Sequence, residues 1–276
     1  MAFEVAPALA LLAAGAVPGS EVTDIVGASH TRLITAGPDG PVAVTVTLHA
    51  DHVDVAHHRV SEPGAAQILT RVRSWLDLDI DHSLVRDALG SDAVIGPLVT
   101  ARPGLRVIGY PHGFEAAVLV VLGQHVSIGA ARTFSGRLVA AFGAPGPAGL
   151  LTFPPPQALA ATSPIDLQAA IGVTHSRATT VHLLAAACSD GLLIDPAGDH
   201  DPIRRQLLAL PGIGPWTVET LAARALGDRN AYPAGDLVLQ RALGVSSSAA
   251  AIRAAAGWAP YRAYGLFHLW SAALGI

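Results

Sequence analysis

The chain has 276 residues, 51% of them hydrophobic, and a formal net charge of −4 at pH 7. This length allows a large buried core, in one big domain or in two to three small ones, and the apolar runs are too short to span a membrane. The slightly acidic balance argues against a broad basic surface for nucleic acid. Any contact with DNA therefore has to be local and has to rely on main-chain amides.

The cysteine and lysine content excludes several kinds of site and reaction. Cys188 is the single cysteine, which excludes a disulfide framework and a cysteine-held zinc or iron–sulfur cluster within one chain. All 17 basic residues are arginines. Without a lysine side chain, a mechanism that needs a lysine Schiff base is excluded.

The apolar run at residues 7–17 is similar to the central part of a signal peptide. Glu4 stands where such a peptide has a basic leader. We therefore expect a folded helix here and a cytoplasmic protein.

Strand signals follow. Residues 42–48 alternate between branched apolar and small or polar side chains, the turn at 38–40 precedes them, and Val53 and Val55 continue the alternation. Helices are expected near 7–16 and 65–76, and helical periodicity prevails after about Asp79. The predicted fold class is α+β, with a small N-terminal antiparallel sheet followed by a larger all-helical body.

The stretch LPGIGPWTVE, residues 210–219, separates two predicted helices at 203–210 and 216–226. In the first helix Leu207, Leu208 and Leu210 are expected to point inward. Gly212 and Gly214 permit positive φ and leave main-chain amides uncovered, an arrangement that binds phosphate at a helix N-terminus. On spacing alone, a plain turn between two helices explains the same residues.

Asp236 lies in PAGDLVLQRAL, after a proline–glycine break and at the start of a predicted helix. This position suits a helix N-cap, and it equally suits a carboxylate held at the mouth of a pocket. Aromatic residues recur in YRAYGLFHLW, residues 261–270. Most of that stripe is expected in the core, with Trp270 a candidate to face a ligand.

Other polar residues carry weaker signals. Arg132, Arg137 and Arg177 are candidates for phosphate contacts, although solvated helix faces are the usual place for scattered arginines. Four histidines, at 49, 52, 57 and 58, have no partner set with convincing metal-binding spacing. A polar sheet face is the preferred interpretation, and no metal site is predicted.

The segments LPGIGPWTVETLAARALG, PAGDLVLQRAL and YRAYGLFHLW together resemble the helix-hairpin-helix DNA glycosylase superfamily, and within it the AlkA-type 3-methyladenine DNA glycosylases. The segment Ala101–Arg132 is similar to the central region of that enzyme type. The resemblance covers nearly the whole chain and is strongest after about residue 70.

The resemblance implies a role for each matching residue. Asp236 corresponds to the catalytic aspartate, and His125, beside Gln124, to the residue that enters the gap left by a flipped base. The expected contacts with the base are Trp216, Trp270, Gln124, Thr220 and Leu237. The expected contacts with DNA are His125, Leu210, Gly212, Ile213, Gly214 and Thr217. Thr220 and Leu237 stand where the family has tyrosines, and His125 where it has an apolar residue.

The function implied is a monofunctional DNA glycosylase that flips alkylated, cationic bases such as 3-methyladenine out of duplex DNA and hydrolyses the N-glycosidic bond in base excision repair. The alternatives are a non-catalytic helix-hairpin-helix DNA- or lesion-binding protein, and a glycosylase for deaminated or oxidised bases. We expect a monomer without cofactor, and only the resemblance suggests a monovalent cation at the hairpin. The expected domains are residues 1–78, residues 79–112 together with 231–276, and residues 113–230.

Overall fold

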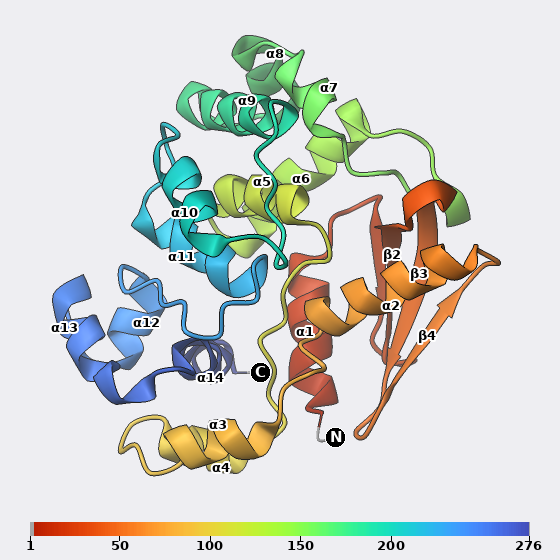
Figure 1. Ribbon diagram of the computed structural model, residues 1–276. Coiled ribbons are helices and arrows are strands. Elements are labelled where there is room, and N and C mark those ends of the chain that lie inside the picture. The colour runs from red at the N-terminus through yellow and green to blue at the C-terminus, as the bar shows by residue number, and fades with distance from the viewer. Residues whose placement is uncertain (1–2, 276) are drawn as a thin grey trace.

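The computed structural model describes residues 3–275 and has a sheet layer beside a larger helical body (Figure 1). The outermost residues of the expected domain ranges, 1–2 and 276, lie outside the described part. This architecture confirms the α+β prediction. Among the helices of residues 3–275, none combines the length and the hydropathy that a membrane span requires.

Four antiparallel strands form the sheet in the order β1-β2-β3-β4. They are β1 Glu21–Asp24, β2 Ser29–Thr35, β3 Pro41–Leu48 and β4 Val53–His57. The pairs Arg32↔Val44 and Val46↔Val55 set the register of the β2–β3 and β3–β4 ladders. The alternating run predicted at 42–48 is β3, whose apolar side chains are buried.

One α-helix precedes the four strands in the described part of the chain, and the others follow them. They are α1 Val5–Gly15, α2 Glu62–Trp75, α3 His82–Leu89, α4 Gly96–Ala101, α5 Gly113–Gly123, α6 Ile128–Phe142, α7 Pro156–Ala160, α8 Pro164–Ile171, α9 His175–Ser189, α10 His200–Leu208, α11 Pro215–Arg224, α12 Leu237–Ala242, α13 Ser248–Ala254 and α14 Arg262–Leu274, with short 3₁₀ turns η1 Gly37–Asp39, η2 Pro147–Gly149 and η3 Ala256–Trp258.

The first core lies between the sheet and the helices α1 and α2. Leu9 and Leu12 of α1 are buried in it together with Val44 of β3 and Trp75 of α2. The N-terminal apolar run is therefore a folded helix, as predicted. Helix α1 packs on β1, β2 and α6, so it connects the sheet to the helical body (Figure 1).

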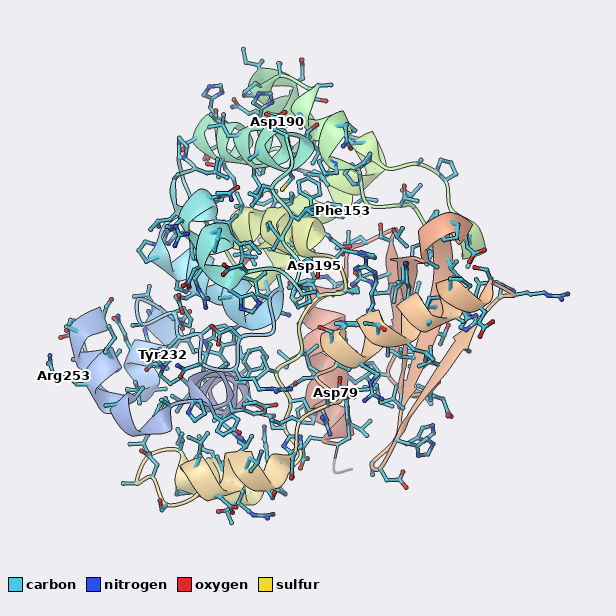
Figure 2. All side chains as sticks on the ribbon, viewed as in Figure 1. Asp79, Phe153, Asp190, Asp195, Tyr232 and Arg253 are labelled. Carbon is cyan, nitrogen blue, oxygen red and sulfur yellow. The ribbon has the colours of Figure 1, made fainter. Side chains whose placement is uncertain are left out.

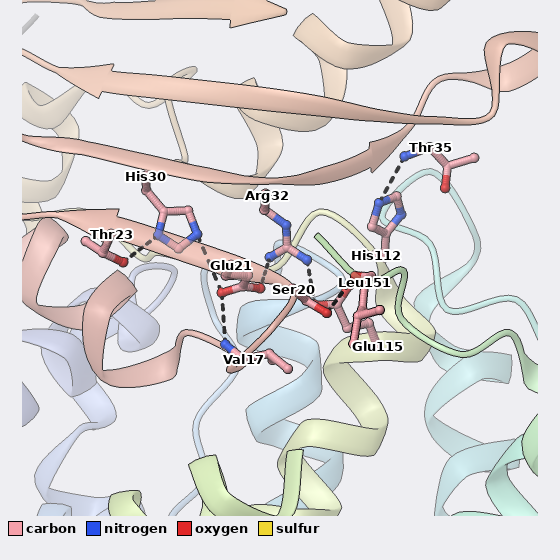
Figure 3. Close-up of polar contacts among 10 residues, drawn as sticks. All are labelled: Val17, Ser20, Glu21, Thr23, His30, Arg32, Thr35, His112, Glu115 and Leu151. Carbon is pink, nitrogen blue, oxygen red and sulfur yellow. Dashed lines mark hydrogen bonds and ion pairs between the residues drawn. The ribbon is translucent and has the colours of Figure 1, made fainter. Parts of the chain in front are cut away.

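A buried ion-pair network also links the two parts (Figure 3). Arg32 of β2 contacts Glu21 at 3.0 Å and Glu115 of α5 at 2.5 Å, and His30 lies 3.5 Å from Glu21. Burial raises the pKa of the Glu115 carboxyl. Burial acts in the same direction on Glu21, but Arg32 and His30 outweigh it and hold the pKa of Glu21 below its usual range.

The second core is formed by the helical body around α5, which packs against α6, α9 and α11. Segments far apart in sequence meet at its lower edge, where α3 packs against η3 and α4 against α14 (Figure 1). Trp258 of η3 is buried there and donates its indole N–H to Asp92 at 2.8 Å. These contacts join the 79–112 and 231–276 regions, whose assignment to one domain stays a prediction.

One side chain of the first hairpin helix differs from its expected place. Helix α10 begins at His200, after Asp199 caps its first turn, and its buried side chains are Ile203 and Leu207. Leu208 is 50% exposed, so the prediction that it points inward was wrong. One helical residue step is about 100°, which turns Leu208 away from the face that Leu207 buries.

Candidate active site

The turn between α10 and α11 has the open amides that its glycines predicted. Gly212 has φ +85°, and a Cβ there would lie 2.0 Å from the Thr180 hydroxyl oxygen, so only glycine fits. In residues 3–275, neither the Gly212 N–H nor the Gly214 N–H has a hydrogen-bond acceptor. Gly214 is the N-cap of α11 and has no side-chain cap. Both amides are therefore available to an anion.

The Gln124–His125 turn is held against this hairpin. The Gln124 side-chain amide donates to the Gly212 carbonyl at 3.2 Å and to the Thr217 hydroxyl at 2.8 Å. Arg177 donates to the Gln124 carbonyl at 2.5 Å. His125 has φ +54° and an exposed side chain. The turn that presents His125 and the hairpin at residues 210–214 thus form one hydrogen-bonded unit.

Three of the expected DNA contacts, Leu210, Ile213 and Thr217, are buried or half-buried. Ile213 is 4% exposed and Thr217 is 2% exposed, so these side chains serve the core and the Gln124 bond. Leu210 is half-buried, and its carbonyl accepts from the Ile213 N–H at 3.1 Å.

Each of the three candidate phosphate-binding arginines donates to a main-chain carbonyl of the protein. Arg132 donates to the Ala13 carbonyl, Arg137 to the Ile171 carbonyl, and Arg177 to Gln124. Each guanidinium thus ties a helix to a neighbouring main chain.

Asp236 is both a helix cap and a pocket carboxylate. It is the N-cap of α12, and its Oδ1 accepts from the Leu239 N–H at 2.8 Å. The indole N–H of Trp216 donates to Oδ2 at 3.0 Å, and that of Trp270 donates to Oδ1 at 3.1 Å. Asp236 is 8% exposed. Two tryptophans from α11 and α14 therefore hold one carboxylate in a fixed orientation.

This carboxylate lies where two hollows meet. An open groove of about 700 Å³ runs from the Gln124–His125 turn past the hairpin to Asp236. Its lining includes Gln124, His125, Gly212, Ile213, Gly214, Trp216, Thr217, Asp236 and Leu237. A second cavity of about 340 Å³ adjoins it, lined by Trp216, Thr220, Asp236 and Trp270 among others. The structure thus gathers the residues to which the resemblance assigns a role, except Leu210, into two adjoining spaces.

Thr220 and Leu237, which stand where the resemblance implies tyrosines, line different parts of this site. Thr220 is 4% exposed at the cavity wall, and its hydroxyl donates to the Trp216 carbonyl at 2.8 Å. Leu237 is 60% exposed at the groove. Thr220 therefore presents little polar surface to a ligand, and Leu237 presents an apolar one.

Several residues of the cavity wall were not predicted from the sequence. Leu11 and Ala14 of α1 line it, as do Tyr110 and Arg224, whose guanidinium lies 4.4 Å from the Tyr110 ring centroid. No local pattern identifies them, because α1 reaches the cavity only through the packing of the sheet layer on the helical body.

The loop before Asp236 is anchored at Tyr232 (Figure 2). The Tyr232 N–H donates to Glu219 of α11 at 2.9 Å, and its hydroxyl donates to the Ala251 carbonyl of α13 at 3.2 Å. Its ring packs edge-on against Trp258 at 6.0 Å between centroids. These contacts hold the loop that positions the Asp236 carboxylate.

The chain is similar to known proteins along most of its length. The family model for the AlkA N-terminal domain matches residues 2–111. DNA-3-methyladenine glycosylase 2 of Escherichia coli is 32% identical over 271 residues, which cover 95% of this chain and 91% of that protein. A probable bifunctional transcriptional activator/DNA repair enzyme AlkA of Mycobacterium tuberculosis is 39% identical over 269 residues. The chain spans 53% of the length of this second relative and 94% of its own.

Solved structures share the fold. The 3-methyladenine DNA-glycosylase from Archaeoglobus fulgidus superposes with a TM-score of 0.85 at 20% identity, covering 99% of this chain and 96% of that one. The 8-oxoguanine glycosylase/lyase of Clostridium acetobutylicum, in complex with double-stranded DNA, superposes with a TM-score of 0.77 at 14% identity, covering 99% and 93% of the two chains. With the match to the Escherichia coli protein, these findings show that the chain belongs to the AlkA-type DNA-3-methyladenine glycosylase family.

Proposed function

We propose that this protein is a monofunctional DNA glycosylase that removes alkylated, positively charged bases such as 3-methyladenine from duplex DNA, as a step of base excision repair. The observation that carries the proposal is the position of Asp236, between two indole donors and at the junction of the groove and the cavity. The name of the Escherichia coli relative supports the substrate class.

We expect the groove to hold the DNA backbone at a flipped nucleotide and the cavity to hold its base. An enzyme that acts on a base in duplex DNA has to extrude it, at a cost of a few kcal/mol that is lowest for damaged bases. The Gly212 and Gly214 amides would bind phosphates of the bent strand, and His125 would occupy the gap in the base stack. The extruded base would enter the cavity beside Trp216 and Trp270, whose faces attract a cationic ring.

Asp236 would supply the chemistry. As the N-glycosidic bond breaks, positive charge develops on the deoxyribose, and a carboxylate beside C1′ stabilises it and orients the attacking water. Oδ1 accepts two hydrogen bonds in the structure and Oδ2 accepts one. Oδ2 therefore retains the acceptor capacity to face the sugar or the water. A cationic base leaves without strong acid catalysis, so one carboxylate suffices.

The proposed product is an intact abasic site. A glycosylase that also cleaves the strand needs an amine to form a Schiff base with the sugar, and the 276 residues include no lysine. This supports hydrolysis without lyase activity.

A monovalent cation at the hairpin is also proposed, because main-chain carbonyls are its usual ligands. The carbonyls of Leu210 and Gly212 each accept one hydrogen bond, from the Ile213 N–H and the Gln124 amide. Each keeps a second lone pair for a cation. Replacing potassium by tetramethylammonium at equal ionic strength should then weaken DNA binding, and unchanged affinity would argue against this cation.

A panel of duplexes tests the function. Each duplex carries one lesion, 3-methyladenine, 7-methylguanine, hypoxanthine, uracil or 8-oxoguanine, and products are scored with and without alkali. We expect release of the methylated purines and strand cleavage only after alkali. Preferred release of a deaminated or oxidised base would move the assignment to another lesion class. Binding without release of any base would support the non-catalytic alternative, and cleavage without alkali would disprove the absence of lyase activity.

A further inference from the structure

The turn between β3 and β4 brings together two imidazoles and a carboxylate, at the free end of the sheet and outside the groove and the cavity (Figure 1). The ligand atoms of His49, His52 and Asp54 all lie within 4.8 Å of one another. The spacing of the histidines does not indicate this set, because the third partner is Asp54, on the strand after the turn.

The main chain holds the turn in one shape. The His49 N–H donates to the His52 carbonyl at 3.0 Å, and Leu48 pairs with Val53 directly behind the turn. The Phe3 N–H donates to the Ala50 carbonyl at 2.9 Å, which ties the turn to the N-terminal segment. Main-chain hydrogen bonds thus hold the backbone that carries the three side chains.

The imidazoles converge on the same carboxylate. His49 Nε2 lies 3.1 Å from Asp54 Oδ2, and His52 Nε2 lies 3.8 Å from Asp54 Oδ1. The two rings stack with centroids 4.2 Å apart and planes 10° from parallel. Both Nε2 atoms therefore face one small volume beside the Asp54 oxygens.

A second carboxylate orients one of the imidazoles. His52 Nδ1 lies 2.7 Å from Asp51 Oδ1. When Nδ1 carries the proton and donates it to a carboxylate, the Nε2 lone pair is left free, which is the arrangement that surrounds metal-bound histidines in proteins. Asp51 would thus be a positioning residue for His52.

We propose that His49, His52 and Asp54 bind a divalent transition-metal ion, of the class of Zn²⁺, Ni²⁺ or Cu²⁺. Imidazole nitrogen together with carboxylate oxygen selects this class, whereas Mg²⁺ and Ca²⁺ take oxygen ligands. With bonds of about 2.0–2.1 Å, tetrahedral ligands lie roughly 3.4 Å apart. The side chains are 40%, 55% and 67% exposed, so small rotations bring the atoms to that spacing.

His57 and His58 do not belong to the site. Antiparallel pairing places His57 opposite Val44, at the other end of β4 from the turn. The His57 Nδ1 contacts the His58 carbonyl at 2.7 Å. His58 therefore provides an exposed histidine on the same hairpin for a matched control.

Calorimetric titration of the full chain with ZnCl₂ tests the proposal. We expect one saturable site, with at least about tenfold weaker binding in His52→Asn and in Asp54→Asn, and unchanged binding in His58→Asn. Zinc should also raise the melting temperature of the parent and of His58→Asn, because a ligand that binds only the folded state stabilises it. That rise should be absent in His52→Asn.

Two outcomes would overturn the metal site. One is the absence of saturable zinc binding to the parent, and the other is an equal loss of binding in His58→Asn. Because the substituted side chains are exposed and outside the base-release site, all three variants should fold and release base as the parent does. The metal site and the proposed glycosylase activity are therefore tested independently.

Discussion

At the scale of single residues, the indole N–H groups around Asp236 are the most direct target. Trp270→Phe keeps an aromatic ring and removes the hydrogen bond to Oδ1. A hydrogen bond to a charged group contributes about 1.5–3 kcal/mol, so single-turnover base release should slow roughly ten- to hundredfold. Trp75→Phe is the matched control, since Trp75 is buried in the first core, away from Asp236. Equal rates for Trp270→Phe and Trp75→Phe would contradict a role for the Trp270 donor.

The two hairpin glycines form a second pair of variants. Gly212→Ala places a Cβ against Thr180 at a positive φ, whereas Gly214 has φ −104° and open space around it. Urea unfolding should show a loss of roughly 1–3 kcal/mol for Gly212→Ala and little change for Gly214→Ala. Affinity for a duplex with an abasic-site analogue should fall with Gly212→Ala. Equal stability of the two variants would mean that the turn relaxes without strain.

The sequence allowed some of these residues to be predicted and not others. The open hairpin amides follow from Gly212 and Gly214, because glycine is what such a turn requires. The capping position of Asp236 follows from the break before it, but its contact with Trp270 depends on how α14 packs. The burial of Thr217 could not be predicted, because it depends on Gln124 at the end of a helix remote in sequence.

At the scale of elements, the tie between β2 and α5 predicts a large effect on stability. Arg32→Met leaves the Glu21 and Glu115 carboxyls buried without their cation. Breaking a buried pair in this way costs about 3–5 kcal/mol, which urea unfolding measures. Arg73→Met is the control, because Arg73 and its partner Asp79 are exposed. A loss no larger than that of the control would show that the buried network contributes little.

The elements differ in how well the sequence predicted them. Strand β3 alternates between branched apolar and small or polar side chains, and this pattern predicts it. Strand β1 has only four residues, EVTD, of which one is apolar, so it carries no such pattern. The end of α10 illustrates the limit within a helix, since Leu207 and Leu208 are adjacent and only packing decides which is buried. The Arg32–Glu115 pair joins positions far apart in the chain, and no periodicity indicates it.

At the scale of the whole molecule, three histidines make stability depend on pH. Burial lowers the pKa of His82 and His268 to about 4 and that of His112 to about 3. The unfolded chain takes up a proton on each near pH 6.5, and the folded protein does not. The contribution of these histidines to the free energy of unfolding is therefore fully present above about pH 6.5. It is lost as the pH drops toward about 4.

Urea unfolding between about pH 7 and about pH 5 measures this dependence. The slope should correspond to uptake of up to three protons on unfolding, and His268→Gln should reduce it by one. His175→Gln, an exposed position on α9, should leave the slope unchanged. A stability that is flat over this range would contradict the burial of neutral imidazoles.

The arrangement of the whole chain was the hardest level to predict. Composition and periodicity indicated an α+β fold, and the resemblance indicated the family. The cavity, in contrast, is closed partly by Leu11 and Ala14 of α1. Their role arises only when the sheet layer docks on the helical body, so no local pattern contains it.

The Asp236→Asn variant tests whether Asp236 performs the chemistry. Asparagine keeps the size of the side chain and still caps a helix, so folding and affinity for a duplex with an abasic-site analogue should stay nearly unchanged. Single-turnover release of 3-methyladenine should fall by on the order of 10²–10³-fold, as when a transition-state charge loses its stabilising group. Release at the parent rate by a folded Asp236→Asn protein would contradict the account.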